Sequence, residues 1–138
     1  GCSYSHSGGT LDQPSLRSVG QVLVAIILDI SFAAHMPDTL EMPYKPRIRN
    51  ASIEPQKDEY TYRFGGMTCL AGDYYGDYSF KEPLNIGDEI IFEDMIHYTM
   101  VKTTTFNGVN LPSIGKINTV GKYINYKSFG FESFKDRL

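Results

Sequence analysis

The chain has 138 residues, a formal net charge of −3 at pH 7 and two cysteines. This length fits one domain, which buries roughly two-thirds of the surface that its unfolded chain exposes. No run of five like charges occurs, so the sequence shows no basic footprint for nucleic acid or for an anionic membrane surface. Two cysteines do not make the disulfide framework of a small secreted domain, and we therefore expect a cytoplasmic protein.

The N-terminal region is predicted to lie outside the fold. Residues 1–20 are rich in Ser and Gly and contain Pro14, a composition that packs poorly, and we interpret them as a tail, a linker or a cloning remnant. The folded domain is expected over residues 21–138. It begins with the longest apolar run, from Val22 to Leu28, which is too short to span a bilayer and is typical of a central strand buried on both faces.

The segment over residues 31–46 is expected to be extended and turning. Proline is excluded from helix interiors, and this segment holds Pro37, Pro43 and Pro46. A short strand is predicted over 47–53, a polar turn over 54–59, and an aromatic strand over 60–64 that leads into a glycine-rich loop.

The second half is predicted to continue in short strands. Gly87-Asp88 forms a tight turn into a strand that ends near Phe92, and another strand is expected from Met95 to Thr105. Asn107-Gly108 suits a turn with positive φ. Residues 123–134 are expected to form one or two strands or a short helix. Because no stretch of eleven residues shows a helical stripe, we predict a mostly-β sandwich or barrel.

Cys69 is the sharpest candidate for chemistry. It lies in a loop flanked by Gly65, Gly66 and Gly72, where the backbone can approach a ligand closely, and Asp73 follows it. A thiol in such a loop can serve as an acid, a base or a nucleophile. Without further information, a free cysteine is more often a small buried hydrophobic residue.

Asp38 and Tyr98 are weaker candidates. Asp38 follows Pro37 in a loop, where we expect its carboxylate to stay exposed enough to meet a cationic group, although an Asx turn or helix cap explains it equally well. Tyr98 is expected on a strand, where packing on the sheet is the default role.

Two other kinds of site find no support. His35, Asp38, Asp94 and His97 lack the close spacing of metal ligands, so we predict no metal site. A nucleophilic lysine needs desolvation or a neighbouring cation, and Lys102 on a Thr-rich strand is sufficiently explained as solvated or ion-paired.

Several short motifs follow one another along the chain. They are Leu28-Asp29, His35-Met36-Pro37-Asp38-Thr39, Met42-Pro43-Tyr44, Cys69-Leu70-Ala71-Gly72-Asp73, Gly76-Asp77-Tyr78, and a block from His97-Tyr98-Thr99 to Phe106-Asn107-Gly108. In this order they resemble the C-terminal third of the carboxynorspermidine decarboxylases, a branch of the fold-type III pyridoxal-phosphate-dependent decarboxylases. Ornithine and diaminopimelate decarboxylases share the cysteine loop and the Tyr-Thr pair, but the His-Met-Pro-Asp and Cys-Leu-Ala-Gly-Asp motifs favour the carboxynorspermidine branch.

The resemblance implies the C-terminal β-barrel or sandwich domain of the alanine racemase/ornithine decarboxylase-like fold, in a head-to-tail homodimer whose active sites lie at the subunit interface. It implies that Tyr98 contacts the phosphate of pyridoxal phosphate and that Cys69 reaches the partner's site and assists protonation after decarboxylation. Asp38 would hold an amino group of a carboxylated polyamine, carboxynorspermidine or carboxyspermidine, and Asp73 would make a second contact.

The same resemblance places the Schiff-base lysine and the glycine-rich phosphate loop in an N-terminal β/α barrel, and we find neither in this chain. We therefore expect that the chain alone does not decarboxylate and that its parent protein does so in norspermidine or spermidine synthesis. One alternative is a non-catalytic dimerisation or regulatory module that pairs with a full-length decarboxylase. Another is a relative that acts on ornithine or diaminopimelate.

Overall fold

A computed structural model describes residues 24–42 and 44–138 of the chain. The predicted tail over 1–20, the first two residues of the predicted apolar strand, and Pro43 lie outside the described residues. The longest helices in the described part have five residues, and none is long and apolar enough to cross a membrane.

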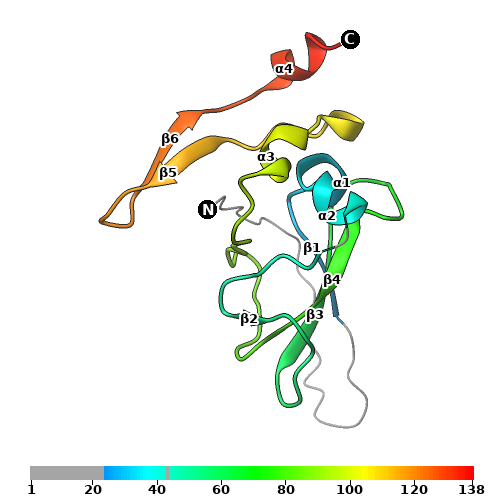
Figure 1. The fold of residues 1–138 in the computed structure, drawn as a ribbon, viewed down its shortest axis with the longest axis vertical. Helices are drawn as coiled ribbons and strands as arrows, with labels where there is room; N and C mark the ends of the chain where they lie inside the picture. Colours follow the sequence, from blue (N-terminus) through cyan, green and yellow to red (C-terminus); the bar gives the residue numbers. More distant parts are fainter. Residues whose placement is uncertain (1–23, 43) are drawn as a thin grey trace.

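The main sheet has four strands, in the order β1-β3-β4-β2 (Figure 1). Strand β1 (Val24–Ile27) runs parallel to β3 (Tyr60–Gly65), which pairs antiparallel with β4 (Tyr74–Phe80), and β4 pairs antiparallel with the short β2 (Ala51–Ser52). Aromatic and β-branched residues favour these pleated strands.

Three short helices gather beside the loop that joins β3 to β4 (Figure 1). They are α1 (Phe32–His35), α2 (Pro37–Glu41) and α3 (Tyr98–Lys102), followed by the 3-10 turn η1 (Phe106–Gly108). The three helices pack against one another.

The core lies on one face of the main sheet and is largely aromatic. On β3, Phe64 is fully buried, and its ring lies 5.8 Å from that of Tyr78 and 6.2 Å from that of Phe80, both on β4. The same core takes in α1, where the Phe32 ring lies 6.0 Å from that of Phe92. Burial of the core therefore fixes α1 against the sheet.

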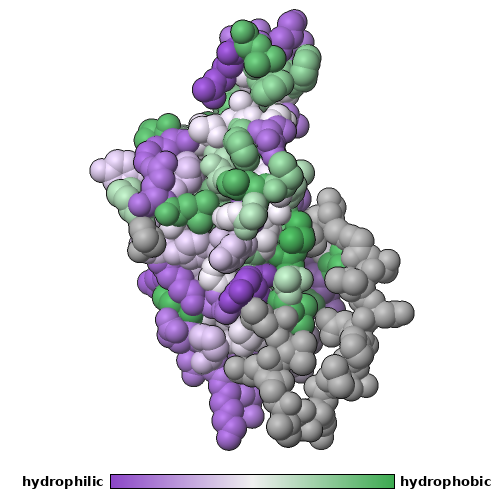
Figure 2. Space-filling model, turned by 90° about the vertical axis from the view of Figure 1, so that its right-hand side faces the viewer, coloured by the Kyte–Doolittle hydropathy of each residue, from purple (hydrophilic) through white to green (hydrophobic). Residues whose placement is uncertain are grey.

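A second sheet and the last helix project from this body (Figure 1), and the C-terminal end of the chain forms the top of the molecule in Figure 2. Strand β5 (Ile114–Ile117) pairs antiparallel with β6 (Tyr123–Lys127), and α4 (Phe131–Lys135) follows. Every residue of β6 is exposed. The prediction of a strand or helix over 123–134 is confirmed.

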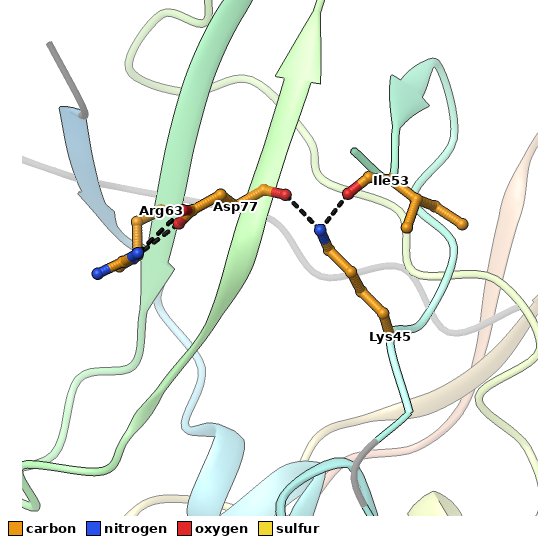
Figure 3. A network of polar contacts seen from close by, with 4 residues as sticks. All are labelled: Lys45, Ile53, Arg63 and Asp77. Carbon is orange, nitrogen blue, oxygen red and sulfur yellow. Dashed lines mark hydrogen bonds and ion pairs between the residues drawn. The ribbon is translucent and has the colours of Figure 1, made fainter. Parts of the chain in front are cut away.

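A lysine clamp ties the segment after α2 to the sheet (Figure 3). The ammonium group of Lys45 donates hydrogen bonds to the carbonyl oxygens of Ile53 and of Asp77, the latter at 2.6 Å, and it lies 4.8 Å from the centroid of the Tyr78 ring. On the outer side of the same strand pair, Arg63 donates two hydrogen bonds, of 2.7 and 2.9 Å, to the Asp77 carboxylate. Because Tyr44 precedes Lys45, this clamp also fixes the position of Tyr44 beside α2.

Several predicted elements are present. The strand over 60–64 and the turn over 54–59 are confirmed, as is positive φ at Asn107 and Gly108, at 58° and 74°. Gly87 also has a positive φ, of 96°, but the strand expected after it is reduced to bridges, one of which pairs Ile48 with Phe92.

The prediction of a central, doubly covered strand at β1 is wrong. This strand lies at the edge of the main sheet, and Val24 and Ile27 are 40% and 55% exposed. An apolar β-branched run predicts a strand, but the strand's place in the sheet depends on its pairing partner.

The two other errors concern helices. The segment predicted to be extended over 31–46 contains α1 and α2, because Ser31 caps α1 and Pro37 occupies the first turn of α2, where a missing N–H costs nothing. The strand predicted from Met95 to Thr105 contains helix α3. There the contacts of Thr99 with α2 override its strand propensity.

We expect Phe64→Ala to lower the free energy of unfolding by about 3–5 kcal/mol, because it empties the centre of the aromatic core. Tyr60→Ala is the matched control, since Tyr60 lies on the same strand and is 50% exposed, and we expect it to cost about 1 kcal/mol or less. Guanidinium denaturation of the 138-residue chain measures both. Equal losses for the two variants would contradict this description of the core.

Candidate functional site

Helix α1 is capped and buried, and it presents polar backbone groups to two neighbouring loops. The Ser31 hydroxyl accepts a hydrogen bond of 3.0 Å from the N–H of Ala34, and this cap starts the helix. Its residues Phe32, Ala34 and His35 are buried. The groups of α1 that this helix does not use internally are therefore available to bind other segments.

The loop that carries Cys69 is anchored on α1 by Asp73. One carboxylate oxygen of Asp73 accepts a hydrogen bond of 3.0 Å from the N–H of Ala33, and the other accepts bonds of 3.1 and 2.5 Å from the N–H and hydroxyl of Thr68. In addition, Met67 N–H donates to the carbonyl of Ile30 at 2.8 Å. These bonds close the loop and attach it to α1 at once.

The pKa of Asp73 reflects this setting. Burial by itself raises the pKa, but hydrogen bonds from Thr68, Ala33 and Ser31 stabilise the charged form and together hold the pKa below its ordinary value. Gly66 is required for the approach, because a Cβ atom there would lie 2.4 Å from both carboxylate oxygens of Asp73.

The segment that follows α3 is attached to the same helix. Thr104 N–H donates to the carbonyl of Ala34 at 2.7 Å. His35 Nδ1 accepts the Ser31 N–H at 3.3 Å, so Nε2 carries the proton and donates to the carbonyl of Asn110 at 2.9 Å. Burial lowers the pKa of His35, and the Asn110 bond and the charges of nearby carboxylates oppose this without reversing it.

Cys69 and Asn107 meet where these two attached segments come together. The amide Nδ2 of Asn107 donates a hydrogen bond of 3.1 Å to Cys69 Sγ. Cys69 is a free, exposed thiol. The interpretation of Cys69 as a small buried hydrophobic residue is therefore wrong for this chain.

Asp38 is buried, which corrects the prediction that it stays exposed. It is 1% exposed in α2, and its Oδ2 accepts hydrogen bonds of 2.5 Å from the hydroxyl of Tyr44 and 2.8 Å from that of Thr99. Within the described residues its Oδ1 has no hydrogen-bond partner. Burial, and next the bond to Asp38, raise the pKa of Tyr44. Asp38 therefore joins α2 to α3 and to the clamped segment.

Tyr98 is the first residue of α3 and is 60% exposed. Its hydroxyl makes no hydrogen bond to any part of the chain that the structure describes. Because Thr99 is bound to Asp38, the position of Tyr98 is set by the contact between α3 and α2. The phenol is thus placed by the fold and is exposed.

The remaining candidates behave as structural residues. Among the described residues no group of three or more potential ligands is arranged to hold a metal ion. Lys102 forms an ion pair with Glu41 across α3 and α2, as predicted for its side chain, although it lies on a helix and not on a strand.

The structure thus brings the predicted residues to one set of packed helices and loops. Asp38 touches the neighbour of Tyr98, and Asp73 holds the loop of Cys69. The sequence motifs do not identify Thr99 and Thr68 as hydrogen-bond partners, and they predict only a turn at Asn107. Thr68 and Asp73 are bonded across five residues, a spacing outside the local patterns in which Ser, Thr, Asn and Asp side chains bind nearby backbone, so no such pattern signals this loop closure.

Apolar side chains are exposed around these residues. Met67 and Leu70 on the cysteine loop are 54% and 45% exposed, and Met100 and Val101 on α3 are 47% and 78% exposed. Figure 2 shows apolar areas, in green, among polar ones on the side of the molecule where α1, α2 and this loop lie.

Comparison with known families identifies the domain. Residues 13–96 match the family model described as pyridoxal-dependent decarboxylase, C-terminal sheet domain. The chain belongs to this family. The resemblance found in the sequence motifs is thereby confirmed, as is the assignment to a sheet-rich C-terminal domain.

Relatives of this sheet domain are named as decarboxylases of carboxyaminopropylagmatine and of carboxynorspermidine or carboxyspermidine. The chain is 56% identical over 112 residues to the carboxyaminopropylagmatine decarboxylase of Synechocystis, and 41% identical over 121 residues to the carboxynorspermidine/carboxyspermidine decarboxylase of Campylobacter jejuni. These alignments cover 81% and 80% of the chain but only 29% and 32% of the relatives.

A solved structure has the same fold. The crystal structure of carboxynorspermidine decarboxylase from Campylobacter jejuni, complexed with norspermidine, superposes with a TM-score of 0.77 and 40% identity. The superposition covers 83% of this sheet domain and 34% of that chain. The sheet domain therefore corresponds to about one-third of these decarboxylases.

We expect Asp73→Asn to loosen the cysteine loop. The neutral amide cannot accept all three of the hydrogen bonds that the carboxylate now receives, and a charged, buried hydrogen-bond acceptor contributes about 1.5–3 kcal/mol. Hydrogen exchange of the amides over 66–73 should accelerate in Asp73→Asn and stay unchanged in the control Asp88→Asn, whose carboxylate accepts a hydrogen bond from the N–H of Asn85 in another turn. Unchanged exchange in Asp73→Asn would contradict the anchoring role.

The pH dependence of stability should show the titration of His35. Because the folded chain holds the pKa of His35 below its ordinary value of 6.5, the unfolded chain binds more protons between the two values. The stability that depends on neutral His35 is therefore fully present above pH 6.5 and is lost as the pH falls through the folded pKa. Urea denaturation from pH 7.5 to 5 should show this loss in the parent chain and a smaller one in His35→Gln. Parallel curves would contradict it.

Proposed function

We propose that this chain is the sheet domain of a pyridoxal-phosphate-dependent decarboxylase whose substrate is a carboxylated polyamine. The observation that carries the proposal is the agreement among relatives of high identity. The relatives at 56% and 41% identity are named for different substrates. Both names nevertheless describe the decarboxylation of a carboxylated polyamine. Carboxyaminopropylagmatine and carboxynorspermidine are therefore the first two substrate candidates.

Tyr98 suits the predicted contact with the cofactor. The pyridoxal ring supplies an electron sink for the bond that breaks when CO₂ leaves. Tyr98 has a phenol that is 60% exposed and carries no bond within the described residues, and it is placed through Thr99. We propose that this phenol donates a hydrogen bond to the cofactor phosphate. The lysine that holds the cofactor is still predicted to lie in the N-terminal barrel.

Cys69 suits a proton donor. Its thiol is exposed, sits in a loop fixed by Asp73, and has an amide donor at 3.1 Å. We propose that the thiol gives its proton to the carbon from which CO₂ departs. The sulfur then keeps the electron pair of the broken S–H bond, and the new C–H bond completes the product.

The acidic residues divide between two roles. Both oxygens of Asp73 already accept hydrogen bonds that anchor the loop. Its direct contact with the substrate stays a prediction, and its anchoring role does not depend on that contact. Asp38 keeps Oδ1 without a partner in the described part of the chain. We propose this oxygen as the acceptor for an ammonium group of the polyamine, because an ionised carboxylate is the natural partner of an amine. Since Asp38 is buried, the side chains that cover it must move aside for the amine to reach it.

The exposure of the site supports a partner subunit. Cys69 and Tyr98 are both exposed and are surrounded by exposed apolar residues. A site that must exclude water during proton transfer needs cover from another polypeptide surface. We propose that this cover comes from a second subunit in a cytoplasmic homodimer.

The test is a decarboxylase assay of the protein expressed from the complete reading frame that encodes this chain. We expect CO₂ release from carboxyaminopropylagmatine or carboxynorspermidine, with kcat/KM at least about a hundredfold above that for lysine or ornithine, since a mismatched charge spacing leaves buried polar groups unpaired. Cys69→Ala should lower kcat by about a hundredfold or more.

Tyr98→Phe separates cofactor binding from chemistry. Removing one phosphate contact should weaken pyridoxal phosphate binding by about tenfold, measured by fluorescence titration, with kcat restored at saturating cofactor. Ion-paired Lys102 offers a control, because Lys102→Arg keeps the charge next to Glu41 and should leave both constants unchanged. Full activity on lysine or ornithine instead of carboxylated polyamines would overturn the proposed substrate class.

A further inference from the structure

We infer that Asn107 is a positioning residue for Cys69: its side-chain amide orients the thiol and stabilises the thiolate that remains once the proton has been given up. The inference deepens the proposed function, because it assigns a support to the proposed proton donor. It begins from the contact of 3.1 Å between Asn107 Nδ2 and Cys69 Sγ.

The contact joins two segments that are independently fixed to one helix. On one side, the cysteine loop reaches α1 through Asp73 and the N–H of Ala33. On the other side, Thr104 N–H is bonded to the carbonyl of Ala34. Since successive residues of α1 hold both segments, the distance between Cys69 and Asn107 is set by the fold and not by two free side chains.

The backbone of Asn107 also points to this residue type. Its φ of 58° and ψ of 19° lie in the left-handed region, and Gly108 follows with a φ of 74°. Asparagine and glycine tolerate this region, whereas most other residues lose about 1–2 kcal/mol there. Of the residues that tolerate the conformation, asparagine brings an uncharged N–H donor to the sulfur.

The chemistry of the donor explains its use. A thiol sulfur is a weak hydrogen-bond acceptor and a thiolate is a strong one, so an N–H aimed at Sγ stabilises the charged form more than the neutral form. When the Cys69 proton moves to the substrate carbon, the electron pair of the S–H bond stays on sulfur. The Asn107 amide then meets this new charge without having to move, which is the advantage of a pre-oriented donor.

The experiment measures the reactivity of Cys69 in the 138-residue chain itself, with Cys2→Ser removing the other thiol. The rate constant for alkylation by iodoacetamide at pH 7.5 reports the thiolate fraction. Asn107→Gly keeps the left-handed backbone and removes the amide, and we expect a rate about three- to tenfold lower. Asn107→Asp also tolerates the backbone and replaces the donor by a negative acceptor, so its rate should fall further.

Two controls separate this effect from loop structure. Asn50→Gly removes an asparagine side chain from another left-handed position, with φ 62°, and should leave the rate unchanged. At pH 10.5, where cysteine thiols are generally ionised, all variants should react at the parent rate because access to the sulfur is unaltered. A slower reaction that persists at pH 10.5 would show altered access and would overturn the inference.

An unchanged or faster alkylation in Asn107→Gly at pH 7.5 would also overturn the inference. A faster reaction would indicate only that the loop has loosened and that the sulfur is more exposed. The measurement needs neither cofactor nor substrate. A negative result therefore leaves the proposed decarboxylase function standing, and a failed decarboxylase assay leaves the Asn107 contact standing.

Discussion

The candidate site depends on the attachment of two loops to one short, buried helix. Helix α1 has only four residues, yet Ala33 binds the Asp73 carboxylate, Ala34 binds Thr104, and His35 binds Asn110. The Ala33 and Ala34 bonds use backbone groups at the ends of the helix, which lack an intrahelical partner, and the His35 bond uses its ring Nε2. The helix is itself fixed by Phe32 in the aromatic core. The packing of the core thereby determines where the candidate side chains lie.

Two buried carboxylates perform different work in this arrangement. Asp73 is satisfied on both oxygens by donors from its own loop and from α1, and its lowered pKa shows that these hydrogen bonds outweigh the cost of burial. Asp38 binds two hydroxyl groups through one oxygen and leaves the other without a partner in the described structure. Asp73 is thus fully occupied in holding the loop, and Asp38 is the carboxylate that we propose for an ammonium group of the substrate.

Two further candidate groups are exposed and not buried. Cys69 and Tyr98 lie outside the core, with apolar neighbours that are half exposed. The chain covers about one-third of the related decarboxylases. In the function that we propose, it supplies a thiol, a phenol and a carboxylate to a site that a second subunit covers. The Asn107 amide belongs to the same set, because a donor that points at a sulfur serves that sulfur when it becomes charged.

The sequence by itself determined the family, the sheet-rich class and the residues of interest. Alternating aromatic residues over 60–64 predicted β3, and Asn107-Gly108 predicted positive φ, because both signals are local. The tertiary structure alone decided that Met95 to Thr105 contains a helix and that Asp38 is buried, since both outcomes depend on the bond between Thr99 and Asp38, 61 residues apart. A contact between distant segments leaves no periodic trace in either one, and for the same reason only the folded chain could place the amide of Asn107 on the sulfur of Cys69.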